Sequence, residues 1–386
     1  MDIKRIVNLP ELLHKNSFFL LGPRATGKSF LIKSQLKGVS HIFDLLDGET
    51  HLRFLEDPTL LEKLCAKIDT EKYIVIDEIQ RNPELLNQVH RMIENEGRRF
   101  LLTGSSARKL KAGGANLLAG RAWEASLFPL TWFEIGNEKF NLERYLRFGG
   151  LPRVVLLNSP DEELYAYAQT YLREEIQAEG LVRKIPQFSR FLKVAALSNG
   201  QMLNYSSVAS DSGVKVSSVR EYFSILEDTL IGFSVGAWSD SQKRKAIETS
   251  KFYLFDTGIA HTLAGTKHID RNSDSFGRSF EHFIAIELRS YISYRRLRIP
   301  LCYWRTINGQ EVDFVLDDVA MEVKATSKAS NRDIKGLKAL AEEGKHKRFL
   351  CISTDPMTRS EQGIEYFYWE DFLRMLWNDE IIKART

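Results

Sequence analysis

The stretch Ser17 to Ser29, SFFLLGPRATGKS, restricts the fold of this chain more than any other. Four consecutive apolar residues predict a short buried strand, the next eight residues match GxxxxGK[ST], and the helical sequence FLIKSQL follows. With glycine at about 7% of residues, the four fixed positions coincide by chance in roughly one protein per hundred. The flanking strand and helix make an accident rarer still, so a glycine turn with a chance Lys-Ser is the weaker interpretation.

This pattern predicts a phosphate-binding loop. In such loops the backbone amides point at phosphate oxygens, the lysine contacts the β and γ phosphates, and the serine hydroxyl binds Mg²⁺. The positive end of the following helix faces the same anion. The predicted nucleotide-binding residues are Gly22, Pro23, Arg24, Ala25, Thr26, Gly27, Lys28 and Ser29.

Further apolar runs predict a parallel sheet around this loop. They cover residues 41–44, 73–76, 100–102 and 123–128, with helical segments between them. Continuous rather than alternating apolar runs are typical of parallel strands covered on both faces. Ligands of such sheets bind beyond the carboxyl ends of the strands. We therefore expect an α/β domain over residues 1–135 with its site at that edge.

Polar residues follow two of these strands. Asp77 and Glu78 come directly after Ile76, where a first carboxylate would hold Mg²⁺ and a second would polarise the attacking water. Without the loop upstream, an acidic pair opening a turn would be the better interpretation. The next strand ends in Thr103-Gly104-Ser105-Ser106, which places small hydroxyls beside the same site, where one could position water or sense the γ-phosphate, although small residues are also ordinary turn formers.

In their order, the motifs GPRATGKS, IVIDEIQ, LLTGSS, LAGRA and FGGLP resemble a prokaryotic AAA+-type ATPase family that carries a C-terminal domain of unknown function. The resemblance implies ATP and Mg²⁺ as ligands. It implies Asp77 as a metal ligand with Ser29, Glu78 as the catalytic carboxylate, and Ser105 or Ser106 as sensor. Arg121, a candidate cation for the transition-state charge, becomes a possible arginine finger, which would act between copies in a homo-oligomer. A second-sensor arginine is not evident.

The length of 386 residues predicts two to four domains. Three scattered cysteines give neither a disulfide framework nor a zinc pattern, and no window approaches 18 apolar residues. A cytoplasmic location without membrane contact is expected. The net charge of +3 decides nothing about partners.

The middle of the chain is predicted to be helical over residues 136–187, with a break at Gly149-Gly150-Leu-Pro152. Residues 188–262 then have the order of a winged helix-turn-helix: helices over 188–198, 206–211 and 217–229, then strands over 230–238 and 251–255.

If the winged helix binds DNA, Ser218 and Arg220 would enter the major groove. Lys243, Arg244 and Lys245 in the hairpin would then reach phosphates. The alternative is a protein-interaction module with a solvated basic hairpin, because fold alone does not give function.

The last part, residues 263–386, is predicted to place charged residues on apolar strands. A helix over 275–291 carries Glu281, and strands over 303–307 and 311–316 flank Asn308-Gly309, a hairpin signal. Glu322 and Lys324 share one face of a third strand, 319–325. Because unpaired buried charge is costly, a second Mg²⁺ or a Mn²⁺ held by Asp313 and Glu322 would explain them, with Glu281 completing the shell and Lys324 orienting water.

The order of these residues resembles the PD-(D/E)xK nuclease family, with Val312 in place of the motif's proline. The alternative is a degenerate nuclease-like fold used for binding. The expected fold class is thus α/β: a P-loop NTPase parallel sheet, a helical and winged-helix region, and an α+β restriction-endonuclease-like domain. The expected domains are an ATPase at 1–135, a helical linker at 136–187, a winged helix at 188–262 and a nuclease-like domain at 263–386.

Two functions from different classes fit this organisation. The first is a Mg²⁺-dependent ATPase acting on nucleic acid in DNA maintenance or defence, with a candidate nuclease domain. The second is a nucleotide-gated switch whose C-terminal modules bind another protein. A small-molecule phosphotransferase would leave the last two domains unexplained.

Overall fold

The computed structural model describes residues 3–106, 118, 120–171, 185–240, 244 and 246–382. The chain forms two compact units. Unit 1 consists of Met1–Pro129 with Ser224–Ile231, and unit 2 of Leu130–Phe223 with Gly232–Thr386.

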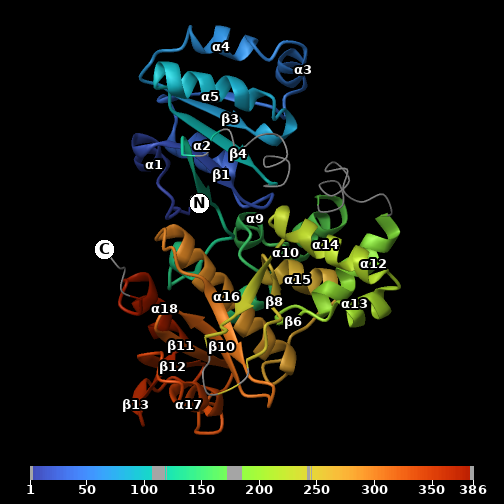
Figure 1. Ribbon diagram of the computed structural model, residues 1–386, viewed down its shortest axis with the longest axis vertical. Helices are drawn as coiled ribbons and strands as arrows, with labels where there is room; N and C mark the ends of the chain where they lie inside the picture. The colour runs from blue at the N-terminus through green and yellow to red at the C-terminus, as the bar shows by residue number, and fades with distance from the viewer. Residues whose placement is uncertain are drawn as a thin grey trace. The chain divides into compact units, whose positions relative to one another are not determined.

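Unit 1 is built on a five-stranded parallel sheet, which confirms the predicted α/β architecture (Figure 1). The strand order is β2-β3-β4-β1-β5. Because β1 lies between β4 and β5, the loop after β1 leaves near the middle of the carboxyl edge. The strands are β1 (Ser17–Leu21), β2 (Ser40–Asp44), β3 (Tyr73–Asp77), β4 (Phe100–Gly104) and β5 (Ala122–Ser126).

Helices cover both faces of this sheet. Alternate strand residues such as Phe19, Ile76 and Leu102 form one core with α3 (Gly48–Glu56), α4 (Leu60–Cys65) and α5 (Leu85–Glu96). The intervening strand residues face the other side, where α1 (Leu9–Lys15) and α2 (Lys28–Gln35) pack. A short 3-10 turn, η1 (Ile79–Arg81), follows β3.

Unit 2 contains a mixed nine-stranded sheet of order β13-β14-β12-β11-β10-β9-β7-β8-β6. Strands β7 and β8 form the expected antiparallel pair, and β7 also pairs in parallel with β9 through Gly236 and Ala237. The sheet is therefore continuous across residue 263. Its strands are β6 (Gln201–Met202), β7 (Gly232–Ala237), β8 (Lys251–Leu254), β9 (Leu301–Arg305), β10 (Glu311–Leu316), β11 (Val319–Lys324), β12 (Arg348–Ser353), β13 (Arg359–Glu361) and β14 (Ile364–Tyr368).

The helices of unit 2 precede and flank this sheet (Figure 1). Three of them, α12, α13 and α14, come in the predicted order before β7 and β8. The helical elements are α7 (Trp132–Ile135), α8 (Leu142–Phe148), α9 (Pro152–Leu156), α10 (Pro160–Ala166), the π-helical turn η3 (Tyr167–Tyr171), α12 (Ile185–Leu197), α13 (Tyr205–Ser212), α14 (Val216–Asp228), α15 (Thr257–Ala264), α16 (Asp274–Tyr294), α17 (Lys335–Ala341) and α18 (Trp369–Trp377). The part of α14 from Ser224 onward belongs to unit 1.

The predicted break after Phe148 is fixed by close packing. A side chain at Gly149 would collide with the carboxylate of Asp256, and one at Gly150 would lie 2.5 Å from the carbonyl oxygen of Leu130. The backbone N–H of Gly150 donates to Asp256 Oδ2 over 2.8 Å, and the same side chain caps α15 by accepting from Ile259 N at 3.0 Å. Complete burial raises the pKa of Asp256 to about 6 although these N–H groups oppose the shift. This break therefore joins α8 to α15.

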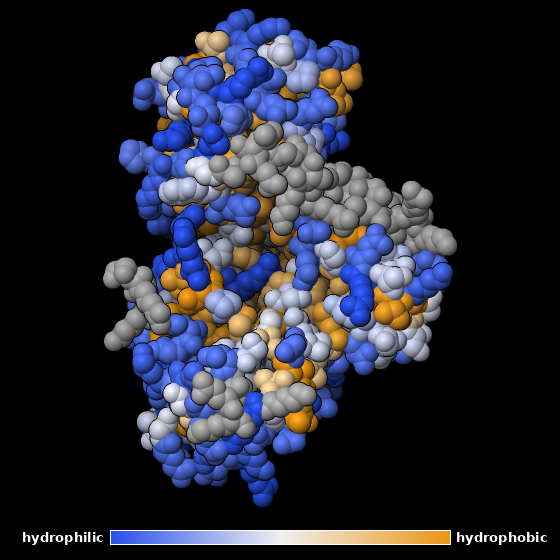
Figure 2. All heavy atoms as spheres, viewed as in Figure 1, coloured by the Kyte–Doolittle hydropathy of each residue, from blue (hydrophilic) through white to orange (hydrophobic). Residues whose placement is uncertain are grey.

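The surface shown in Figure 2 is mostly hydrophilic, with hydrophobic residues in small groups. Among the described helices, none is both long enough and apolar enough to cross a bilayer.

Candidate functional site

The loop between β1 and α2 has the tight winding that its glycines predict. Gly27 adopts φ +93°, a left-handed conformation that favours glycine. A side chain at Gly22 would collide with the carbonyl oxygen of Leu127. Inside the loop, Lys28 Nζ donates to the carbonyl oxygens of Gly22 at 2.6 Å and Pro23 at 3.2 Å. The lysine ammonium therefore lies at the mouth of the loop, where phosphate oxygens would replace carbonyl oxygens.

Arg5 supports this loop, and the motif search did not find it. Its guanidinium donates to the carbonyl oxygen of Thr26 at 2.9 Å and to that of Phe128 at 2.6 Å, and the residue is only 8% exposed. These two bonds tie the loop backbone to the segment after β5. A single arginine near the N-terminus carries no motif, so only the packed structure reveals this role.

The acidic residue after β3 meets the loop serine. Ser29 Oγ donates to Asp77 Oδ2 over 2.8 Å, and Asp77 is buried. A hydroxyl and a carboxylate are oxygen ligands of the kind that Mg²⁺ takes in nucleotide sites, usually together with waters and phosphates. The residues present fit the predicted metal-binding role of Ser29 and Asp77.

Thr103 at the end of β4 connects the two acidic residues. Its hydroxyl donates to Asp77 Oδ1. The same hydroxyl accepts from the backbone N–H of Glu78, and this bond is 2.9 Å long. Glu78 has φ +61°, a left-handed conformation that is uncommon outside glycine. Strain of this kind is typical of functional sites. The kink turns the chain immediately after β3, where the sequence places the second carboxylate.

Ser105 contacts the acidic pair only through a neighbour. Gln80 Nε2 donates to Glu78 Oε2 and, at 3.2 Å, to Ser105 Oγ. Ser106 is fully buried. Thr103, one of the small hydroxyls that the sequence predicts beside this site, contacts Asp77 directly, as Ser29 does. Because Ile76 pairs with Leu102 in the parallel register of β3 and β4, the next residues along the two strands, Asp77 and Thr103, lie side by side.

Arg121 lies at the opposite edge of the sheet from the loop. It immediately precedes β5, whose first residue, Ala122, pairs with Ser17 at the start of β1. Five strand residues, roughly 16 Å, thus separate it from the carboxyl edge. Its guanidinium forms an ion pair with Glu94 on α5. The structure does not bring Arg121 to the loop of its own chain.

The four residues of the expected nuclease site do come together in unit 2. Lys324 Nζ lies 2.6 Å from Glu322 Oε1 and 3.9 Å from Asp313 Oδ2, which also accepts from the backbone N–H of Val323 at 2.8 Å. Although burial opposes it, the carboxylates of Asp313 and Glu322 raise the pKa of Lys324. Burial also raises the pKa of Glu322 well above its usual range.

A fifth charged residue, Lys251 on β8, lies among these carboxylates. Its Nζ is 3.0 Å from Glu281 Oε1, 2.7 Å from Glu311 Oε1 and 3.7 Å from Asp313 Oδ1. Burial would lower the pKa of Lys251, but the surrounding carboxylates raise it well above its ordinary value. We call Lys251, Glu281, Glu311, Asp313, Glu322 and Lys324 the charge cluster.

The expected second metal is not supported by this geometry. Within the described parts of the chain, no group of three or more His, Cys, Asp or Glu side chains is arranged to hold a metal ion. The physical reason is that Lys251 and Lys324 already pair with the carboxylates that would be its ligands.

The two described residues among the predicted DNA contacts, Arg220 and Arg244, have different surroundings. Arg220 is exposed on α14 and lies over the ring of Tyr205, 4.6 Å from its centre. Arg244 instead contacts the α17 region: it donates to the carbonyl oxygen of Ala339 at 2.8 Å and pairs with Glu342 and Glu343. This pairing differs from the expected phosphate contact. Lys243 and Lys245 lie outside the described residues.

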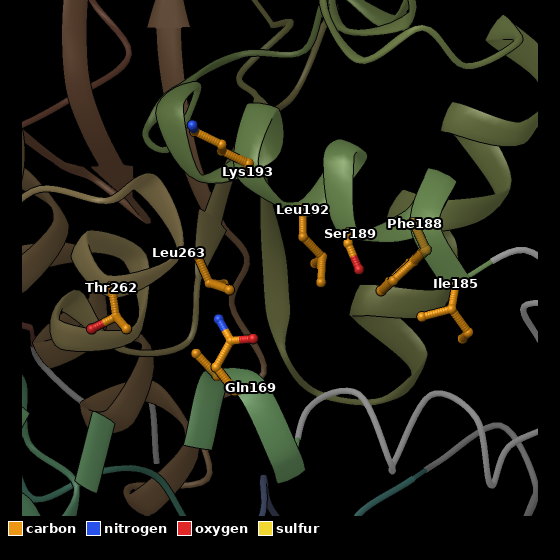
Figure 3. Close-up of a pocket in the computed structure, with 9 residues that line it drawn as sticks. Gln169, Ile185, Phe188, Ser189, Leu192, Lys193, Thr262 and Leu263 are labelled. Carbon is orange, nitrogen blue, oxygen red and sulfur yellow. The ribbon is translucent and has the colours of Figure 1, made fainter. Parts of the chain in front are cut away.

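Unit 2 also contains a hollow of about 400 Å³ between α12, α15 and η3 (Figure 3). Phe188 and Leu192 line it, with Lys193 as the one charged residue among those that form its wall. We assign this hollow no ligand.

Comparison with known proteins divides the chain into three matched regions. Residues 14–136 match the family model of an AAA domain. Residues 139–270 match a domain of unknown function (DUF8612), and residues 276–372 match another (DUF4143). The first match covers the loop, β3 and β4, and supports ATP and Mg²⁺ as ligands of this site.

The relatives are uncharacterized prokaryotic proteins. One from Mycobacterium tuberculosis is 27% identical over 335 residues, covering 83% of this chain and 73% of its own length. One from Methanocaldococcus jannaschii is 22% identical over 351 residues, covering 82% and 75%. A solved structure, Drosophila ORC bound to AT-rich DNA and Cdc6, is similar at 9% identity with a TM-score of 0.23, covering 67% of this chain and 89% of its own. A score this low supports no argument about function.

Proposed function

We propose that this chain binds ATP with Mg²⁺ and hydrolyses it at the carboxyl edge of the unit 1 sheet. The observation that carries the proposal is the connected set Ser29, Asp77, Thr103 and Glu78, which lies beside the phosphate-binding loop. Isolated motif matches would not require these residues to be connected by hydrogen bonds.

Each residue has a distinct role in this proposal. Lys28 binds the β and γ phosphates, and Ser29 with Asp77 would hold Mg²⁺, which neutralises phosphate charge when bound. Glu78 orients the attacking water and accepts its proton. Thr103 orients the carboxylate of Asp77 and holds the backbone of Glu78 in place.

Two substitutions separate binding from turnover. Lys28→Ala should abolish ATP binding, because the phosphates lose the loop cation. Glu78→Gln should retain binding but reduce turnover by about 10²–10⁴-fold, the usual contribution of a general base. Nucleotide affinity and phosphate release would be measured in each, with Lys33→Ala on the exposed side of α2 and the exposed Glu84→Gln as matched controls. Hydrolysis by Glu78→Gln at the wild-type rate would remove that residue from its role.

For unit 2 we infer a nucleotide-gated binding role rather than nuclease action. Arg244 is neutralised by two glutamates, and the charge cluster contains its own cations. DNA binding through a winged helix is the competing function, supported by the order of α12, α13, α14, β7 and β8 and by the exposed Arg220.

Measuring ATP turnover with and without single- and double-stranded DNA distinguishes the two. Stimulation that is reduced by Arg220→Ala but kept in the neighbouring exposed variant Glu221→Ala would favour DNA. Turnover that is indifferent to DNA would favour a protein partner.

A further inference from the structure

The charge cluster contains a cation among the carboxylates that the PD-(D/E)xK resemblance assigns to a metal. Carboxylates from α16 and β10 converge on Lys251 Nζ at 2.7–3.7 Å, and the residue is only 3% exposed. Tyr253, two residues further along β8, donates its hydroxyl to the same Glu281 oxygen at 2.6 Å. Both side chains come from a strand outside the sequence segment that carries the nuclease-like pattern.

A divalent ion would compete with the ammonium groups of Lys251 and Lys324 for carboxylate oxygens. Mg²⁺ requires about six oxygen ligands at roughly 2.0–2.1 Å in near-octahedral geometry. One oxygen of Glu281 and one of Asp313 already face Lys251. Glu322 Oε1 faces Lys324. Because like charges repel strongly at these separations, metal entry would require the buried ammonium to leave.

The cluster is also nearly balanced in charge without a metal. Glu281, Glu311, Asp313 and Glu322 supply four carboxylates, against Lys251, Lys324 and Arg305, which pairs with Glu311. Removing one member of a buried pair leaves an uncompensated charge, which is strongly destabilising. The cluster is therefore a set of mutually paired buried charges.

We propose that the nuclease-like site of this chain holds no divalent metal, because the ammonium group of Lys251 takes the cation position between Glu281 and Asp313. The site then has no metal-dependent nuclease activity. Its role is to join β8 to α16 and β10 through buried ion pairs.

The primary test counts Mn²⁺ bound by the full-length, nucleotide-free protein, using electron paramagnetic resonance. Wild type and Asp313→Asn should bind equal numbers of Mn²⁺ ions, since any ion at the loop of unit 1 is common to both. A wild-type protein that binds one more Mn²⁺ per chain than Asp313→Asn would overturn the proposal, and so would Mn²⁺-dependent DNA cleavage lost in Asp313→Asn.

A gain of binding tests the role of Lys251 itself. Lys251→Met keeps most of the aliphatic stem and removes the charge, so it should bind one additional Mn²⁺ per chain, which the double variant with Asp313→Asn should lose. Lys251→Arg keeps the charge and should bind none in addition. A folded Lys251→Met protein without additional Mn²⁺ would show that the lysine does not hold the position. If Lys251→Met fails to fold, the number of Mn²⁺ ions bound by wild type and by Asp313→Asn still tests whether the site holds a metal.

Discussion

At the scale of single residues, Thr103 is the side chain that links the Asp77 carboxylate to the backbone of Glu78. Its buried hydroxyl bonds to Asp77 and to the backbone of Glu78 at once. Thr103→Val keeps the shape but removes the hydroxyl, leaving a backbone N–H without its partner. We expect ATP turnover to fall about 10–100-fold, the usual cost of losing a group that orients metal ligands. Thr103→Ser should keep most of the activity. Unchanged turnover in Thr103→Val, measured by phosphate release, would contradict this role.

Sequence patterns predict the residues of the loop and the acidic pair, but they do not predict the side chains that support them. Lys28, Ser29, Asp77 and Glu78 were predictable because strand, loop and carboxylate stand at fixed local spacings. The supporting contact of Arg5 spans 123 residues to Phe128, and Lys251 reaches Glu311 from 60 residues away. No local periodicity encodes such pairs, because only the completed sheet brings them together.

At the scale of elements, the Gly149-Gly150 break is a joint between helices rather than a flexible link. A methyl group at Gly150 would lie 2.5 Å from the Leu130 carbonyl oxygen and 2.6 Å from Tyr145 Oη. Gly150→Ala should therefore destabilise unit 2 by about 1–3 kcal/mol, as overpacking usually does. Gly277→Ala in α16 meets no atom within 4 Å and should stabilise by up to about 1 kcal/mol. Urea unfolding of both variants measures the difference, and equal stabilities would refute the steric explanation.

The strand elements of unit 1 match their predicted positions closely, and the central strands β1, β3 and β4 are short, mostly apolar runs. The β7–β9 pairing was not predictable in the same way. Gly236 and Ala237 pair with Cys302 and Tyr303 across more than sixty residues, and nothing in either short segment specifies the other. The sequence therefore predicts where strands lie along the chain better than it predicts which distant strands pair.

At the scale of the whole molecule, one buried carboxyl should make stability depend on pH. Burial raises the pKa of Glu287 to about 8 from an ordinary 4.5, while the N–H groups of Trp132 and Trp377 oppose the shift. The folded state then holds a proton that the unfolded state has lost. The contribution is fully present below pH 4.5 and is lost as pH rises through about 8.

We therefore expect the unfolding free energy of unit 2 to fall between pH 5 and 8, by at most about 1.4 kcal/mol per pH unit from this group. Glu287→Gln removes the titration and should flatten that slope, whatever constant loss its altered hydrogen bonds cause. Five of the six tryptophans lie in unit 2, so tryptophan fluorescence in urea follows its transition. The same slope in both proteins would exclude Glu287 as the cause.

Arg121 lies far from the loop of its own chain, so a catalytic role would require it to act on the loop of another copy. A finger acting between copies predicts that turnover per chain rises with protein concentration, and that mixing Arg121→Ala with Lys28→Ala partly restores activity. Such fingers contribute about 10³–10⁵-fold. Glu94→Ala is the matched control, because it breaks the ion pair but keeps the arginine. If Glu94→Ala reduces turnover as much as Arg121→Ala and mixing restores nothing, the arginine is structural.

The parallel contact between β7 and β9 also has a consequence for how this chain can be divided. The two matched regions of unknown function meet between residues 270 and 276, yet one sheet runs through both. A fragment ending at residue 270 would expose the edge of β7 and leave Lys251 without its carboxylate partners. Open edges of this kind promote aggregation. The two regions are thus separate units of sequence similarity within one compact unit, and we expect neither to become stable before β9 and β10 have been synthesised.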